Sequence, residues 1–418
     1  MRISTIQAFN NGVQGLQRNY ASVTRTQEQI STGNRILTPA DDPVASVRLL
    51  QLEQQQNVLT QYKDNLTAAD NSLTQEEATL NSVNTILQRV RELAVQAGNG
   101  GLSQADRQSI AAELGEREGE LLGLMNTRNA RGEYLFAGFQ GKTQPFVRQA
   151  DGSYSYEGDE GQRKLQVASS LDLAISDSGK KIFENVTNAG RVDSALTVSP
   201  AGSTLSVSAP LVQDEVAFAA APPNNFPAAG IQIVFGNPDA SSYEVFEIGV
   251  PAPVLANGKL DDDPGNSDQL VFRGVTLQFD GVPVGGETIQ VTADPSQEKQ
   301  GILTTIANLR TALEDGVDTP AGSLQIRDAV AEALTNLDHG MSTVDGVRGE
   351  IGARLNIIDS TRTDNEDVSL VNKGVQADLR ELDYAEALSR LSFQSVILEA
   401  AQQSYVKISS LSLFNQLR

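Results

Sequence analysis

The 418 residues include 32 Lys and Arg against 53 Asp and Glu, which gives a formal net charge of −21. A field of that sign repels phosphate backbones and anionic lipid surfaces, so the composition argues against nucleic acid as a partner. The chain has no Cys, which excludes disulfides, thiolate metal sites and a cysteine nucleophile. No stretch approaches the ~20 apolar residues of a membrane span, and we expect no membrane insertion.

The N-terminal segment is predicted to be an amphipathic helix without the apolar core of a signal peptide. Its apolar residues recur at alternating steps of three and four, with Gln27 as a polar member, and Gly33 ends the pattern. This spacing is typical of an a/d seam, so the helix needs another helix as its partner. The seam consists of Ile6, Phe9, Val13, Leu16, Tyr20, Val23 and Ile30.

A second, much longer helix is predicted from about Pro43 to Ala97. Asp41 or Asp42 can cap its N-terminus, and proline is favoured at the first helical position. At a rise of ~1.5 Å per residue this helix would be roughly 80 Å long. Glycines stop it after Ala97, and Ser103 can cap a third helix that runs to about Arg131.

The helical period disappears between Gly132 and Pro295, where short alternating runs predict strands. Asp151-Gly152 and Asp280-Gly281 each separate two such runs, which indicates hairpins. The second of these hairpins would pair Val275 to Phe279 with Ile289 to Val291. This part of the chain is therefore predicted to be a β-rich block.

Helical spacing resumes after Pro295, and a last helix is predicted from about Asp367. This last helix carries two apolar stripes and so presents a wide apolar face, which needs more than one neighbour. The first stripe is Leu388, Leu391, Leu398 and Tyr405, and the second is Leu379, Leu382, Phe393, Val396 and Ala400.

These elements predict an α+β fold: an elongated, antiparallel, coiled-coil-like helical rod formed by both ends of the chain, with a central β-rich domain inserted. We expect a terminal helical assembly domain from residues 1–42 and 367–418. The helical rod domain would comprise residues 43–139 and 296–366, and the outer β domain residues 140–295.

The sequence contains little that points to catalysis. The only His is His339, which the helical pattern places on a solvated surface, so neither a two-His zinc site nor a Ser-His-Asp relay can form within one chain. Asp261 to Asp263 with Asn266 and Asp268 could be a solvated turn or a calcium loop, although the spacing lacks the EF-hand glycine and glutamate. We predict no catalytic residue, cofactor or metal.

The run from Gln29 to Ala45, QISTGNRILTPADDPVA, resembles the signature between the first two helices of the flagellin and hook-associated protein family. Pro43-Val44 after the paired aspartates is similar to the hook-associated members rather than to flagellins. Gly132 to Gly138 and Gly286 to Val291 are similar to the strands by which those members leave and re-enter their helical domain. The ending Leu411 to Asn415 also agrees.

The resemblance implies a structural subunit of the bacterial flagellum, not an enzyme. Such a subunit would be secreted unfolded through the flagellar type III export channel and would form a ring of its own copies at the hook-filament junction. Its implied partners are hook-associated protein 1, flagellin and a flagellar export chaperone. Two alternatives stay open: a flagellin of the filament itself, and a surface β domain with adhesive or enzymatic activity carried on a flagellin-like rod.

The expected functional site is a surface rather than a pocket. The assembly interface is predicted on the seam of the first helix together with the first stripe of the last helix. The loop between the first two helices would fix the angle at which subunits meet. This signature loop comprises Gly33, Asn34, Arg35, Asp41, Asp42 and Pro43.

Overall fold

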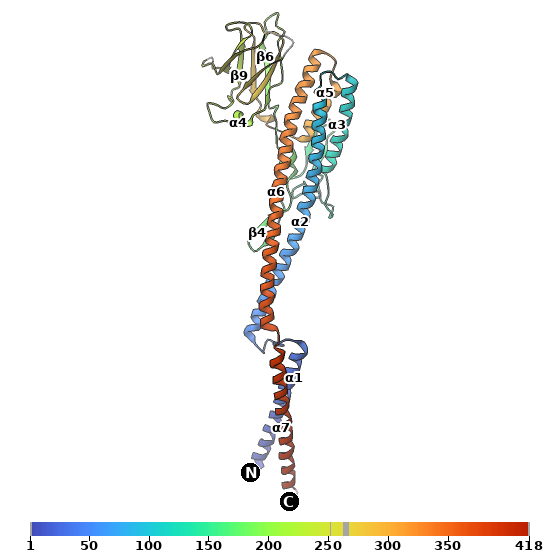
Figure 1. Ribbon diagram of the computed structural model, residues 1–418, viewed down its shortest axis with the longest axis vertical. Coiled ribbons are helices and arrows are strands. Elements are labelled where there is room, and N and C mark those ends of the chain that lie inside the picture. Colours follow the sequence, from blue (N-terminus) through green and yellow to red (C-terminus); the bar gives the residue numbers. More distant parts are fainter. Residues whose placement is uncertain (1, 251, 262–266, 417–418) are drawn as a thin grey trace. The chain divides into compact units, whose positions relative to one another are not determined.

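The computed structural model describes residues 2–250, 252–261 and 267–416. Their contacts form two compact units, and two long helices contribute to both (Figure 1). These helices are α2 (Pro43–Ala97) and α6 (Pro320–Arg380). The first unit comprises Met1–Leu66, Val167–Ser170 and Asp359–Arg418, and the second comprises Thr67–Gln166 and Leu171–Ile358.

The second unit contains a helical bundle with a heptad core. Leu73, Leu80 and Leu87 of α2 follow one another at intervals of seven and are fully buried. On α6, Leu337, Val344, Ile351 and Ile358 repeat at the same interval with at most 1% exposure. A strict seven-residue repeat keeps the apolar seams of two helices in contact along their length. Ion pairs from Arg91 to Asp338 at 2.7 Å and from Arg348 to Glu77 at 3.0 Å join α2 and α6 beside this core.

Two shorter helices complete the bundle. They are α3 (Gln104–Met125) and α5 (Ile302–Asp315), which lie side by side. As the sequence predicts, Ser103 caps α3, and a reciprocal bond with Asp106 completes a capping box. Arg310 of α5 donates to Glu118 of α3 at 2.9 Å.

The β-rich region lies between α3 and α5 in the sequence, and all its strand pairs in the described residues are antiparallel. One sheet has the order β11-β10-β9-β14-β6, and a second has β12-β13-β7, with β8 also paired to β13. The smaller pairs are β1-β2, β3-β4 and β15-β5. The strands are β1 (Phe146–Arg148), β2 (Tyr154–Tyr156), β3 (Lys164–Ala168), β4 (Leu171–Ala174), β5 (Val186–Thr187), β6 (Val192–Val198), β7 (Ser206–Val207), β8 (Leu211–Val212), β9 (Ile231–Phe235), β10 (Ser242–Glu247), β11 (Ala256–Lys259), β12 (Asp268–Phe272), β13 (Val275–Asp280), β14 (Thr288–Ala293) and β15 (Lys299–Gln300).

The two larger sheets share one apolar core. Alternate residues of their strands are buried, as in the pattern of Ile231, Ile233 and Phe235 along β9. The ring of Phe235 meets that of Phe279 from β13 edge to face, with centroids 5.8 Å apart. The predicted α+β fold, with helices from both ends of the chain and a central β region, is confirmed.

One of the two predicted hairpins is wrong. Asp151-Gly152 does connect β1 to β2, with Arg148 opposite Tyr154. Asp280-Gly281 follows β13, but β13 and β14 belong to different sheets and do not pair. The glycine turns the chain from one sheet to the other, with φ at +90°. A turn sequence alone does not specify which strands pair.

Three helix and strand boundaries also differ from the prediction. The helix expected to reach Arg131 ends at Met125, and Gly132 to Gly138 forms turns rather than a strand. No helix starts at Asp367, because α6 continues to Arg380. The last helix begins only at Tyr384, where the side chain of Asp383 accepts hydrogen bonds from the amides of Ala385 at 2.9 Å and Glu386 at 3.2 Å.

The η1 segment (Lys180–Glu184) is a short π-helix that lies between β4 and β5 in the sequence. Two further short helices are α4 (Glu215–Phe218) and the 3₁₀ turn η2 (Pro295–Gln297). These segments connect the strands and carry no part of the candidate assembly surface.

Candidate assembly surface

The terminal helices α1 (Arg2–Thr32) and α7 (Tyr384–Gln416) pack against each other as an antiparallel pair (Figure 1). Near one end, the rings of Phe9 and Tyr405 lie 5.2 Å apart. Near the other end, the Thr26 hydroxyl donates to the Gln394 side chain at 2.8 Å, and Thr26 is buried. The chain therefore supplies the helical partner that the seam of the first helix requires.

The face of α7 that meets α1 follows a heptad spacing. Its least exposed residues occur at steps of four and three through the described side chains. They are Ala387, Leu391, Gln394, Leu398, Ala401 and Tyr405. Three members of the first predicted stripe thus face α1 within one chain, whereas Leu388 is 52% exposed.

The predicted seam of α1 is divided in the same way. Val13, Leu16, Val23 and Ile30 are half-buried. Phe9 and Tyr20 are 44% and 64% exposed. The side chain of Ile6 lies outside the described part of the chain.

An apolar surface stays open on the helix pair. Phe393 and Val396, both from the second predicted stripe, are 68% and 64% exposed, and Ile397 and Val406 are also exposed. Leu379 and Leu382 of that stripe are half-buried and belong to the end of α6 and the segment after it. A groove of about 480 Å³ lies beside Val13, Leu16, Gln17, Tyr20 and Tyr405. Contiguous exposed apolar side chains mark sites of protein association.

The signature loop begins at Gly33, which has a φ of +70°. A Cβ at this position would lie 2.9 Å from the Tyr384 hydroxyl oxygen, so the backbone conformation favours glycine and a larger residue would displace the tip of the Tyr384 side chain. The Gly33 carbonyl accepts a hydrogen bond from the Leu382 amide at 2.9 Å, and the Arg35 amide donates to the Arg380 carbonyl at 2.8 Å. The loop is thereby bonded to the connection between α6 and α7.

Side chains extend this contact. The Arg35 guanidinium donates to the Leu379 carbonyl at 2.9 Å, and the Arg380 guanidinium donates to the Asn34 side chain at 3.1 Å. Gln29 donates to the Arg35 carbonyl at 2.6 Å. Residues at opposite ends of the sequence therefore hold one another in a defined arrangement.

The two aspartates of the loop have separate structural roles. Asp41 accepts hydrogen bonds from the amides of Leu37 at 2.9 Å and Thr38 at 3.0 Å, and it pairs with Arg25. Asp42 accepts from the Ala45 amide at 2.9 Å and so caps α2, with Pro43 at its first position. The sequence left the N-cap open between Asp41 and Asp42, and the structure identifies it as Asp42.

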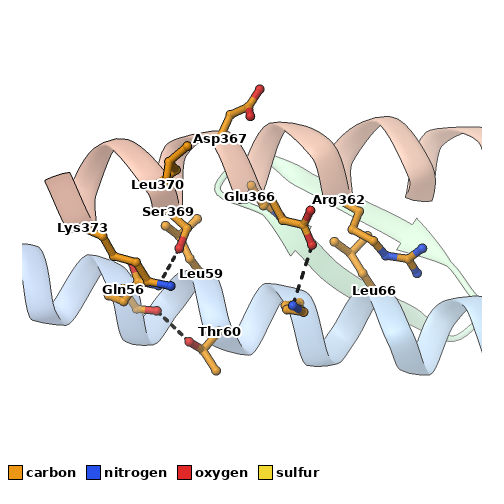
Figure 2. A pocket seen from close by; sticks show the side chains of 12 residues that line it. Gln56, Leu59, Thr60, Leu66, Arg362, Glu366, Asp367, Ser369, Leu370 and Lys373 are labelled. Atoms are coloured by element: carbon orange, nitrogen blue, oxygen red, sulfur yellow. Dashed lines mark hydrogen bonds and ion pairs between the residues drawn. The ribbon is translucent and has the colours of Figure 1, made fainter.

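Beyond the loop, α2 and α6 meet in the first unit through a partly polar seam. Gln56 donates to the Ser369 hydroxyl at 2.7 Å, and Lys63 lies 3.7 Å from Glu366 (Figure 2). These residues line a cleft of about 640 Å³. The apolar seam is tight only where Leu66 lies, fully buried, at the end of this stretch.

Sequence reasoning missed further exposed apolar side chains on these two helices. They are Val44, Val47 and Leu50 on α2 and Val368, Leu370 and Val371 on α6, all at least 51% exposed. The available signal was that these residues do not fit the seam positions of their own helices.

Other features of the described residues offer little chemistry. His339 is half-buried, and its Nδ1 lies 2.9 Å from the Thr187 carbonyl, so the predicted solvated position is wrong. In the described part of the chain, no three His, Asp or Glu side chains come together as a metal site. Asp262 to Asn266, and with them most of the possible calcium loop, lie outside the described residues. Among the helices described, none has the length and apolar character to cross a membrane.

Comparison with known proteins finds similarity to flagellar proteins. Residues 3–141 match the model of the bacterial flagellin N-terminal helical region. The chain is 35% identical over 188 residues to flagellar hook-associated protein 3 of Escherichia coli (strain K12), an alignment that covers 45% of this chain. The matched stretch spans 58% of the length of that relative.

Solved structures of flagellar proteins are similar to this chain over most of its length. Flagellar hook-associated protein-3 from Legionella pneumophila aligns with a TM-score of 0.63 and 25% identity, covering 79% of this chain and 98% of that one. FlgL from Xanthomonas campestris aligns with a TM-score of 0.61 and 25% identity, covering 78% and 99%. In sequence and in fold, the chain is therefore similar to flagellar hook-associated protein 3, and its N-terminal third is similar to the helical region of bacterial flagellins.

Proposed function

We propose that the chain is a structural subunit of the bacterial flagellum that forms the junction between hook-associated protein 1 and the flagellin filament. The observation that carries the proposal is the joint similarity, in sequence and in fold, to hook-associated protein 3. The subunit acts as a ring of its own copies, with neighbours above and below. It acts outside the cell after type III export.

The open apolar face of the helix pair supplies the driving force for assembly. Phe393 and Val396 each expose most of their side chain in the single subunit. Burying a large apolar side chain contributes roughly 1.5 to 3 kcal/mol, and in a closed ring this gain recurs in every copy. The hydrogen-bonded signature loop holds the helix pair in one arrangement, which lowers the entropy lost when subunits join.

A flagellin of the filament is the second candidate, because the matching family model describes the N-terminal region of flagellin. Position along the flagellum separates the two. Immunogold labelling with antibodies against this chain should mark only the base of each filament. Label along the whole filament would identify a filament subunit and refute the junction assignment.

Charge substitutions on the open face test how the subunit assembles. Phe393→Asp and Val396→Asp should prevent filament attachment, because each places an ionised carboxylate in a dry interface. Both side chains are exposed, so the melting temperature of the isolated subunit should change little. Gln88→Asp, at an exposed position of α2 outside the terminal helix pair, is the control and should assemble normally. Normal filaments on either apolar-to-Asp variant would refute this face as the interface.

The β region could carry an additional adhesive or enzymatic activity, but the flagellar relatives support a structural role. Glycan arrays and hydrolase assays on the full chain address this point. Specific binding or turnover would contradict a purely structural subunit.

A further inference from the structure

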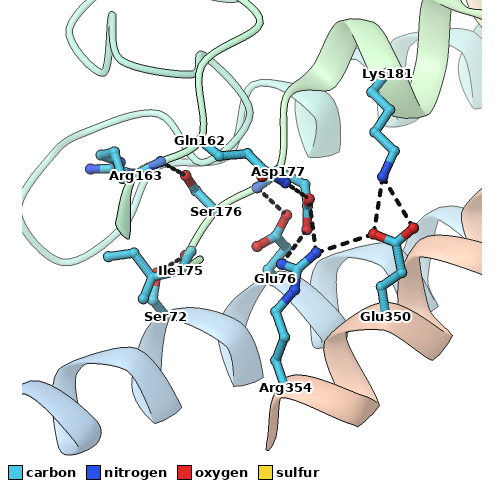
Figure 3. Close-up of polar contacts among 10 residues, drawn as sticks. All are labelled: Ser72, Glu76, Gln162, Arg163, Ile175, Ser176, Asp177, Lys181, Glu350 and Arg354. Atoms are coloured by element: carbon cyan, nitrogen blue, oxygen red, sulfur yellow. Dashed lines mark hydrogen bonds and ion pairs between the residues drawn. The ribbon is translucent and has the colours of Figure 1, made fainter. Parts of the chain in front are cut away.

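A buried polar cluster lies in the second unit, where the residues between β4 and η1 contact α2 and α6 (Figure 3). Asp177 from this connection is fully buried, and Glu76 from α2 is 2% exposed. The Arg354 side chain from α6 is 12% exposed. Two carboxyl groups and one guanidinium thus share a site with little access to water.

The three side chains are bonded unequally. Arg354 donates to both carboxylate oxygens of Asp177, at 2.7 and 3.1 Å, and Gln162 donates to the same carboxylate at 2.6 Å. Glu76 instead accepts a hydrogen bond from the Asp177 amide at 3.1 Å. The strong bidentate pair therefore belongs to Asp177, while Glu76 faces a neutral donor.

The charges around the cluster give Glu76 little compensation. Arg354 also donates to Glu350 at 3.2 Å, and Lys181 of η1 pairs with Glu350 at 3.0 Å. The Arg163 guanidinium donates to Glu133 at 2.7 Å. The nearby cations are thus shared with other carboxylates, and Asp177 adds a negative charge beside Glu76.

Burial raises the pKa of Glu76 well above its ordinary value, and the neighbouring Asp177 carboxylate raises it further. The Asp177 amide and the charges of Arg354 and Arg163 act in the opposite direction and are weaker. A carboxyl group in such a site costs less free energy when it is protonated.

The residues attached at this site form what we term the latch segment, residues 175–181. Besides the contacts of Asp177, the Ile175 carbonyl accepts from the Ser72 hydroxyl at 2.9 Å, and Lys181 reaches Glu350 on α6. We propose that the attachment of the latch segment to α2 and α6 depends on a proton. In the attached state Glu76 is a neutral carboxylic acid, and Asp177 is the carboxylate bound by Arg354.

The sign of the effect follows from linkage. Glu76 binds its proton more tightly when the latch segment is attached to α2 and α6, the closed state, than when it is detached, the open state. The closed state is therefore most favoured at low pH. This advantage is lost as pH rises through the raised pKa of the closed state. One coupled proton can change the closing equilibrium by up to ~10-fold per pH unit in that range.

Hydrogen exchange on the full chain between pH 6 and pH 9 tests the proposal. After correction for intrinsic exchange rates, protection of the latch segment in the native chain should fall with rising pH, by up to ~10-fold per unit. Glu76→Gln keeps the acceptor for the Asp177 amide without the charge, so its protection should stay constant and exceed that of the native chain at pH 9. Glu77→Gln, which alters the next carboxylate, paired with Arg348 on the bundle surface, should retain the pH dependence.

Constant protection in the native chain, or the same fall in Glu76→Gln, would overturn the proposal. If Glu76→Gln does not fold, the protonation state of Glu76 can be measured directly in the native protein. The ¹³C resonance of the Glu76 side-chain carboxyl should still report the protonated form at pH 6, where exposed glutamates are ionised. An ionised Glu76 at pH 6 would also overturn it.

Discussion

Replacing Gly33 by alanine should weaken the attachment of the signature loop to the connection between α6 and α7. The residue has a φ of +70°, and an added Cβ would lie 2.9 Å from the Tyr384 hydroxyl oxygen. A left-handed conformation costs a residue with a Cβ ~1 to 2 kcal/mol, and displacing the tip of the tyrosine adds to this. We expect a total loss of about 1 to 3 kcal/mol in the closing free energy of the loop.

The amides of Arg35 and Leu382 report this loss directly, because they form the two backbone hydrogen bonds between the loop and the connection. A loss of 1 to 3 kcal/mol corresponds to about 5- to 150-fold faster hydrogen exchange at these amides. Combining Gly33→Ala with Tyr384→Phe removes the hydroxyl group and should recover the steric part of the loss, leaving the backbone part.

Gly15→Ala is the control, since Gly15 lies inside α1 and has open space where a Cβ would be. Alanine is the better helix former, so this change should stabilise α1 by ~0.5 to 1 kcal/mol. Exchange at Arg35 and Leu382 that is no faster in Gly33→Ala than in Gly15→Ala would refute the reasoning.

Three further predictions concern stability and partners. Leu66→Asp should lower the free energy of unfolding of the isolated subunit by at least ~3 kcal/mol and clearly lower its melting temperature, because Leu66 is fully buried. Phe9→Asp, at a position 44% exposed, should abolish filament attachment with a much smaller decrease in melting temperature. Equal decreases in the two variants would contradict the assignment of Phe9 to assembly. Burial raises the pKa of Glu184 to about 7, so the stabilising contribution of its protonated form is present below pH ~4.3 and is lost as pH rises through 7. Between pH 4 and 8, the melting temperature should therefore fall less in Glu184→Gln than in the native chain. An equal fall in both would contradict this role of Glu184. An export chaperone should co-purify with the full chain but not with a chain lacking residues 380–418, and retention by the truncated chain would place its contact elsewhere.

The helical parts of the fold were predictable because their signals are local. The seven-residue repeat of Leu73, Leu80 and Leu87 identifies the buried face of α2 without knowledge of its partner. Asp42 before Pro43, and the glycines after Ala97, mark the ends of the same helix. The order of helix, strand and helix followed from the change in period along the chain.

The errors occurred where structure depends on distant residues. The break between α6 and α7 contains no Gly or Pro, and its signals are the cap at Asp383 and the hydrogen bonds that Arg380 and Leu382 form with the signature loop. The separation of β13 from β14 into two sheets depends on the other strands with which each of them pairs. His339 is half-buried, and its ring contacts the carbonyl of Thr187, which is 152 positions away in the sequence.

The candidate surface was predictable in kind but not in detail. The heptad spacing identified apolar faces on both terminal helices, yet it could not tell which face is used within the chain. The structure pairs Leu391, Leu398 and Tyr405 with α1 and leaves Phe393 and Val396 open. The Glu76, Asp177 and Arg354 cluster had no sequence signal, because its members lie 101 and 177 positions apart.

Deletion of the gene for this chain, followed by electron microscopy of the flagella, tests the central claim most directly. A junction subunit is needed to attach the filament but not to build the hook. The account therefore predicts cells with hooks that lack filaments and with unassembled flagellin in the medium. Filaments of normal number and length on the deletion strain would contradict it.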